Sequence, residues 1–324
     1  MRPLMWILCN AMQTKQFNRE TFLECVKSVL PTTTKTCIWI IKITLAVSFA
    51  MMLLKYFRIL PWISDAVSPV FSIFGLPGSA ALAFVSGYFV NCYSALAIIS
   101  TLDLDTRAIT ILAAMVMCSH SMVLETAVLR KTGASGTRMV AVRTLSSFIL
   151  GIALNLILPG SQASAGASTA VIEDMSFLTM LWEWFLSSLK LVLMMTCIIY
   201  SLNILQRILT EFGVIDRVGK VFKPLMYVFG LPEKTVFLWI VANVVGLGYG
   251  AAAILDEVQR GGLSQEEVNI LDSHICISHS NFEDLLLFTA CGAVWWIVLL
   301  SRWAMSILLV WEYRLELRIK SAVD

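Results

Sequence analysis

The sequence predicts an all-α polytopic membrane protein of two inverted repeats, each with three transmembrane helices and one re-entrant helical hairpin. Three observations predict this: the composition, the order of the apolar runs and an internal repeat. Of the 324 residues, 58% are hydrophobic and only 14% are charged, with a mean hydropathy of +0.80. A soluble domain carries about 25% charged residues. The net charge is +2 and no basic tract occurs, which argues against a nucleic acid polymer as partner.

The first half of the sequence contains an N-terminal arm, three apolar runs, one interrupted apolar segment and a polar loop. Residues 1–34 mix apolar and charged side chains and predict an amphipathic arm on the membrane surface. Apolar runs long enough to span then occur at 37–60, 78–100 and 139–158. Between the last two lies 108–129, which is interrupted by Ser119-His120-Ser121. The polar stretch 159–170 predicts a loop.

The second half has the same kinds of segment. Spans are predicted at 176–206, 233–255 and 292–311, and residues 268–291 are again interrupted, here by Ser278-His279-Ser280. Ser264 followed by Glu267 resembles a capping box at the start of that segment. A short tail at 315–324 is expected in the cytoplasm.

Two matched segments show that the chain repeats itself. FSIFGLPGSAAL at 71–82 matches MYVFGLPEKTVF at 226–237, and SHSMVLE at 119–125 matches SHSNFED at 278–284. The repeats are therefore placed at about 35–160 and 174–314.

Charges near the ends of the apolar runs predict the orientation of the repeats. Lys and Arg gather in the N-terminal arm, in 130–138, in 207–223 and in the tail, whereas 159–175 has none and 256–267 is mostly acidic. By the positive-inside rule, both termini should be cytoplasmic and the loops 159–175 and 256–267 should face outward. This requires 108–129 and 268–291 to be re-entrant hairpins, so that three spans per repeat invert the second repeat.

Polar groups at the hairpins predict a substrate site between them. Inverted-repeat transporters build their sites near mid-membrane from broken helices, and buried polar groups in membranes are costly unless they function. We expect His120 and His279 to approach each other across the pseudo-twofold axis. The candidate substrate-binding residues are Ser119, His120, Ser121, Ser278, His279, Ser280, Asn91 and Asn243.

Each half also places an acid 18 residues before an arginine: Glu125 before Arg143 and Asp284 before Arg302. Pairing would neutralise charges that are expensive in lipid. The pairs either clamp each hairpin to the following span or form part of a gate.

A metal hypothesis rests on His274, Cys276 and His279, since 276 and 279 share a helix face and could hold a soft metal. The first half offers Cys118 and His120 but no match to His274. The eight cysteines form no C-x-x-C pair and read as small apolar residues.

The Phe-Gly-Leu-Pro segment, the glycine-rich span and the Ser-His-Ser segments resemble the nucleoside recognition, or Gate, family of bacterial inner-membrane proteins. This family includes the Gate segments of the ferrous-iron permease and is distantly similar to the concentrative nucleoside transporters. The resemblance covers about 40–312 and implies a membrane transport role. No GTP-binding domain accompanies it, a departure from the full-length iron permease.

Three functions remain open at this point. The first is a secondary transporter of a small polar or anionic solute, nucleoside-like chemistry included, coupled to a proton or sodium. The second is a divalent-metal permease, and the third is a membrane scaffold that transports nothing. No catalytic motif has its expected context, so an enzyme is not expected, nor is a resident cofactor. The expected location is the bacterial inner membrane, as a multi-pass protein in contact with lipid, with homo-oligomerisation open.

Overall fold

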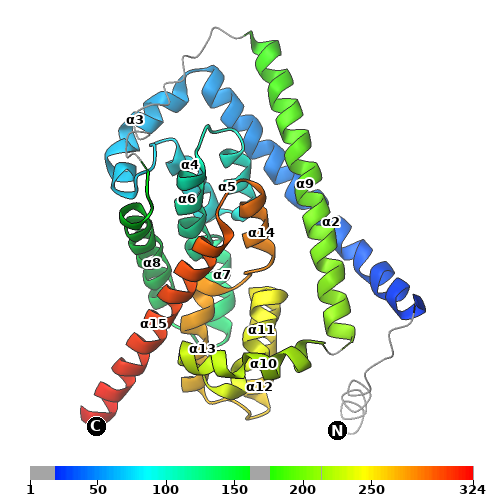
Figure 1. Ribbon diagram of the computed structural model, residues 1–324, viewed down its shortest axis with the longest axis vertical. Coiled ribbons are helices and arrows are strands. Elements are labelled where there is room, and N and C mark those ends of the chain that lie inside the picture. The colour runs from blue at the N-terminus through cyan, green and yellow to red at the C-terminus, as the bar shows by residue number, and fades with distance from the viewer. Residues whose placement is uncertain (1–18, 161–175, 213, 324) are drawn as a thin grey trace.

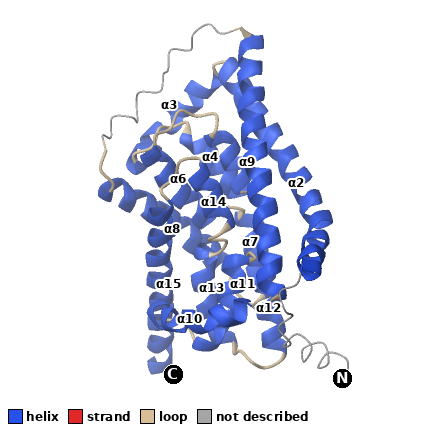
Figure 2. Ribbon diagram, turned by 45° about the vertical axis from the view of Figure 1, so that its right-hand side comes forward, coloured by secondary structure: helices blue, strands red, loops and turns tan. Residues whose placement is uncertain are grey.

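A computed structural model describes residues 19–160, 176–212 and 214–323, and in this part of the chain it contains helices and connecting loops (Figure 2). The all-helical prediction is thus confirmed. The first eighteen residues of the predicted arm, and most of the predicted loop 159–170, lie outside the described residues. From Arg19 onward the arm continues without interruption into the first long helix.

The first half consists of one long helix, a short helix and then several pieces separated by breaks. In chain order these are α2 (Arg19–Tyr56), α3 (Ile59–Phe71), the 3-10 turn η1 (Ser72–Phe74), α4 (Ala80–Phe89), α5 (Cys92–Ile99), α6 (Thr106–Ser119), α7 (Met122–Lys131) and α8 (Gly136–Ile157).

The second half repeats this order of elements. It consists of α9 (Phe177–Glu211), α10 (Val214–Phe229), η3 (Glu233–Thr235), α11 (Val236–Val244), α12 (Leu247–Gln259), α13 (Gln265–Ser278), α14 (Glu283–Ala290) and α15 (Trp295–Val323). Helices α6 and α13 both have 14 residues and both end at a serine before a histidine. The predicted capping box is present, because Ser264 and Glu267 bond reciprocally at the start of α13.

The segments that fold back on themselves are not the ones predicted. Helices α4 and α5 pack against each other on either side of a break at Val90-Asn91. Helices α11 and α12 pack against each other in the same way, with their break at Val245-Gly246. A helix of 10 residues such as α4 extends about 15 Å, roughly half of a bilayer core. The prediction that 78–100 and 233–255 each form one span is therefore wrong.

The predicted hairpin 108–129 instead continues in one direction. Thr106–Lys131, which covers α6 and α7, is a candidate span of 26 residues, and four further candidates are Glu20–Tyr56, Gly136–Ile157, Phe177–Leu209 and Trp295–Ala322. Figure 1 shows α7 beyond the end of α6, and α14 likewise beyond the end of α13. The assignment of 108–129 as a re-entrant hairpin is therefore wrong. A polar break predicts where a helix ends, but it does not predict whether the chain reverses direction there.

The broken helices form the centre of the molecule. Every residue of α6 from Ala108 to Ser119 is buried, and so is every residue of α13 from Ile270 to Ser278. Long helices α2 and α9 pack along each other on one side (Figure 1) and expose large apolar side chains such as Trp39 and Leu193. The outer helices therefore suit contact with lipid, and α6 and α13 are shielded from it.

Residues 130–138 and 256–267 lie at the same end of the molecule. The Gln265 side-chain amide donates to the Thr132 carbonyl at 3.0 Å, and Arg138 pairs with Glu312 and Glu316 near the end of α15. The prediction that these two loops face opposite sides of the membrane is therefore wrong. This error follows from the misplaced hairpins. When a hairpin is taken for a span, or a span for a hairpin, the loop that follows is assigned to the wrong side of the membrane.

Candidate functional site

The two Ser-His-Ser breaks meet at the centre of the bundle. His120 follows the end of α6 and His279 follows the end of α13. Their ring centroids lie 5.1 Å apart, and they are 4% and 0% exposed. The structure thus brings together the two histidines that the repeat predicted as neighbours.

Each break is fixed by the helical hairpin of its own half. Ser121 and Ser280 adopt left-handed backbone conformations, with φ of 47° and 51°. The Ser121 amide donates to the Gly87 carbonyl at 2.9 Å, and the Ser280 amide donates to the Ala242 carbonyl at 3.2 Å. Since a broken helix leaves amides without helical partners, these bonds satisfy backbone that lipid could not.

One carboxylate oxygen lies between the two imidazoles. Glu125 is on α7, and its Oε1 is 3.0 Å from His120 Nε2 and 3.1 Å from His279 Nε2. Its other oxygen accepts from Arg143 Nη2 at 2.5 Å. The acid of the first half therefore joins the histidines of both halves.

Each ring nitrogen of His279 faces an acceptor. Its Nδ1 lies 2.7 Å from the Ile275 carbonyl, and its Nε2 lies 3.1 Å from Glu125 Oε1. A neutral imidazole has one N–H and can donate only one of these two bonds to a carbonyl and an ionised carboxylate. One additional proton, on His279 or on Glu125, would allow both bonds to form.

The two arginines bind their breaks in matching ways. Arg143 donates through Nε to the Cys118 carbonyl and through Nη2 to the His120 carbonyl, at 3.1 and 2.7 Å. Arg302 donates in the same way to Ile277 and His279, at 2.8 and 2.9 Å. Both arginine side chains are completely buried. Each arginine thus binds the backbone exposed where its helix breaks.

The predicted pairing of Asp284 with Arg302 is wrong. Among the described residues Asp284 forms no ion pair with Arg302, and its Oδ2 lies 3.5 Å from His120 Nε2 instead. The Arg302 guanidinium donates to Asn281 Oδ1 at 2.6 Å. An aspartate is one methylene shorter than the glutamate of the first half, and Asn281 supplies the acceptor.

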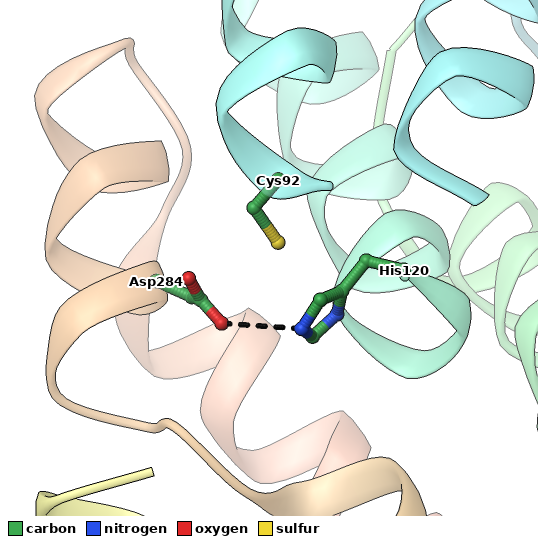
Figure 3. A group of neighbouring side chains, drawn as sticks. All are labelled: Cys92, His120 and Asp284. Atoms are coloured by element: carbon green, nitrogen blue, oxygen red, sulfur yellow. Dashed lines mark ion pairs between the residues drawn. The ribbon is translucent and has the colours of Figure 1, made fainter. Parts of the chain in front are cut away.

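Cys92 completes a second group around His120 (Figure 3). The possible ligand atoms of Cys92, His120 and Asp284 all lie within 4.8 Å of one another, and so do those of His120, Glu125 and His279. Bond lengths of about 2.0–2.3 Å to zinc place neighbouring ligand atoms roughly 3.3 Å apart. Small movements would allow either group to hold a divalent cation.

The metal set predicted from sequence is not brought together. His274 contacts the Ser278 and Ser306 hydroxyls and the Trp239 indole, and the Cys276 thiol bonds to the Ser273 carbonyl. Neither belongs to a ligand group among the described residues. The three-residue spacing of Cys276 and His279 had suggested a shared helix face, but α13 ends at Ser278, before His279.

The other predicted substrate residues mostly bind protein atoms. The Ser119 and Ser121 hydroxyls donate to the Met115 and Val90 carbonyls. Asn91 caps α5, and Asn243 accepts from Asn281 at 2.6 Å. Ser278 contacts His274, and Ser280 holds the strained turn. These residues shape the breaks, and the titratable centre lies beside them.

Sequence reasoning did not identify Cys92, Asn281 or Glu283 as site residues. Glu283 accepts a hydrogen bond from Tyr93 on α5. Asn281 could have been found, because it occupies the repeat position of Met122, whose sulfur faces Arg143. Cys92 and Tyr93 gave no signal, since only the fold of the α4–α5 hairpin brings them to the centre.

Comparison with known proteins agrees with the resemblance stated above. Residues 37–154 match the Gate family model, described as nucleoside recognition. Over 272 residues the chain is 29% identical to an uncharacterized membrane protein, YvoD, of Bacillus subtilis (strain 168). The matched region covers 83% of this chain and 87% of YvoD. The solved structures include no match to the chain.

Proposed function

Since this chain is a membrane protein with a Gate domain in its first half, we propose that it is a secondary transporter coupled to a proton. The cargo would be a small polar or anionic solute, with nucleoside-like chemistry included. The observation that carries the proposal is the contact of His279 Nε2 with Glu125 Oε1 between the two halves, where one additional proton would complete the hydrogen bonds. A transporter needs such a group, which can gain and lose charge inside the membrane.

The arrangement of the helices supports an inverted-repeat mechanism. Elements α3 to α6 lie toward one end of the molecule and α10 to α13 toward the other (Figure 1). We place α4–α5 and α11–α12 as re-entrant hairpins entering from opposite sides, with α6–α7 and α13–α14 crossing between them. Rocking of one half against the other would then expose Glu125 and His279 to each side in turn.

Charge around the centre favours a cation as the coupling ion. The acids are Glu125, Glu283 and Asp284, and the two arginines offset two of them. One bound proton would bring this group to neutrality, whereas a buried net charge is expensive. Loss of that proton would leave one acid uncompensated, so binding of the proton should favour binding of a neutral or anionic solute beside it.

Calorimetry can test this proposal directly. Binding of uridine, inosine or succinate would be measured in two buffers with different ionisation enthalpies, which gives the number of protons taken up or released. We expect about one proton per solute bound for the wild type, and none for Glu125→Gln or His279→Gln. His274→Gln removes the third histidine outside the centre and serves as control. Solute binding without proton exchange in the wild type would refute coupling.

A second candidate, a divalent-metal permease, is favoured by the ligand groups around His120. Here Mn²⁺ or Zn²⁺ would be the substrate, bound by His120, Glu125 and His279. Either ion should then raise the melting temperature of the wild type and of Cys276→Ala, but not of His279→Gln. If neither solutes nor metals bind, the scaffold hypothesis gains support.

A further inference from the structure

A pocket of about 310 Å³ lies at the end of the molecule, between the two halves. The loop before α8 and the first turn of α8 form one wall, and α13 and the end of α15 form the other. Its lining includes Arg138, Asn269, Asp272, Ser273, Tyr313 and Lys320. Asp272 is fully buried within this wall.

The hydrogen bonds of Asp272 leave room for a proton. The Thr132 hydroxyl donates to Asp272 Oδ2 at 2.6 Å, and the same hydroxyl also lies 2.6 Å from the Leu129 carbonyl. A hydroxyl has one hydrogen, so the carboxyl group and the carbonyl compete for it. A proton bound to Asp272 would allow the carboxyl group to donate to the Thr132 oxygen while Thr132 donates to Leu129.

The surrounding charges agree with a neutral Asp272. Its Oδ1 has no hydrogen-bond partner, and among the described residues Asp272 is in no ion pair. The two cations of the pocket are already paired, Arg138 with Glu312 and Glu316, and Lys320 with Glu316. The Arg138 guanidinium also lies over the ring of Tyr313, 4.7 Å from its centroid. A buried carboxylate without a counter-ion would be strongly destabilised.

We propose that Asp272 is a second proton-binding residue, which exchanges its proton with the solution through this pocket. Asp272 lies in α13, and His279 directly follows the last residue of this helix, Ser278. The seven residues from Asp272 to His279 correspond to about 10 Å along the helix. The role of Asp272 as the entry point for protons on this side rests on the proposed function. Its protonation and its access through the pocket do not.

Infrared difference spectroscopy on the purified full chain tests the proposal. Wild type should show the carbonyl stretch of a protonated carboxylic acid that Asp272→Asn lacks and that Asp256→Asn, an exposed control on α12, retains. If Asp272→Asn loses no such band, the proposal is wrong. A band lost in Glu125→Gln reports the histidine centre separately, so the failure of one proposal is distinguishable from that of the other.

Access through the pocket is tested without changing Asp272. Asn269 is half-buried in the wall, and Asn269→Phe would fill the pocket. The shift of the Asp272 band after transfer into D₂O should be fast in the wild type and slower in Asn269→Phe. Equal rates in the two proteins would overturn the exchange route. This measurement remains informative if Asp272→Asn does not fold.

Discussion

Glu125 and Arg143 form a buried ion pair in which the arginine also binds backbone. The guanidinium donates to the Cys118 and His120 carbonyls as well as to the carboxylate. Changing one member leaves an uncompensated charge, so Glu125→Gln and Arg143→Gln should each cost about 3–5 kcal/mol of stability. The double change should cost less than the sum of the two, because the residues interact directly.

Thermal unfolding of the purified variants in detergent measures this coupling. Arg107→Gln provides a control, because Arg107 bonds Asn155 at the far end of α8 and should add independently to either change. Strict additivity of Glu125→Gln and Arg143→Gln would show that the pair contributes nothing.

Asn281 should matter more than Asp284 for stability, because Asn281 bonds to the Arg302 guanidinium. The Asn281 side chain accepts from Arg302 and donates to Asn243 and to the Ser278 carbonyl. Asn281→Leu leaves a buried guanidinium and an amide short of partners and should cost about 3 kcal/mol. Asp284→Asn removes no ion pair with Arg302 and should cost less than about 1 kcal/mol.

Melting temperatures of Asn281→Leu and Asp284→Asn, compared in one detergent, distinguish the two arrangements. A larger loss for Asp284→Asn would restore the pairing that the sequence implied. Asp284→Asn should instead change the histidine centre, because Asp284 Oδ2 faces His120.

The repeated tripeptide was enough to predict the meeting of His120 and His279, because equivalent elements of two homologous halves face each other. The separation of 18 residues was enough to place Glu125 beside Arg143. The same rule failed for Asp284, where a shorter acid and a neighbouring amide change the partner. Spacing reports which residues can meet, and side-chain length decides which of them bond.

At the scale of elements, the α11–α12 hairpin depends on one close approach. A Cβ at Gly250 would lie 2.8 Å from the Ala242 Cβ and 3.0 Å from its Cα, whereas a Cβ at Gly248 would meet nothing within 4 Å. Gly250→Ala should therefore cost about 1–3 kcal/mol. Gly248→Ala should be neutral or stabilising by up to about 1 kcal/mol, since alanine favours helix.

Both glycines lie in α12, so the two variants are matched in element and chemistry. Unfolding curves that order them the other way would show that α11 and α12 do not pack as a hairpin. The first half has the same contact with the residues exchanged, because a Cβ at Gly87 would approach the Ala95 Cβ at 3.1 Å.

Hydrophobicity located the helical segments but not the path of the chain through them. Residues 78–100 are mostly apolar, yet the break at Val90-Asn91 turns the chain back, and Asn91 caps the next helix. Residues 106–131 contain the more polar break, yet the chain continues. Small residues such as Gly87 and Ala95 allow the two helices of the hairpin to pack closely. Their role can be recognised only when the packing of these helices is known.

At the scale of the whole molecule, basic residues gather at one end. Arg130, Lys131 and Arg138 lie there with Arg314, Arg318 and Lys320 of α15, and Gln265 bonds to the same loop. The other end has acidic Asp103 and Asp105 before α6. By the positive-inside rule, the basic end should face the cytoplasm.

Cysteine labelling of cells tests this topology on a background without native cysteines. Lys131→Cys and Glu266→Cys should react from the cytoplasmic side and Asp103→Cys from the outside, since all three positions are exposed and the first two share one end. An impermeant reagent added to intact cells should therefore modify only Asp103→Cys. Labelling of Lys131→Cys and Glu266→Cys from opposite sides would mean that the chain crosses the membrane between Lys131 and Glu266 an odd number of times. That result would support the re-entrant assignment of 268–291 and contradict the arrangement of α12 and α13 described above.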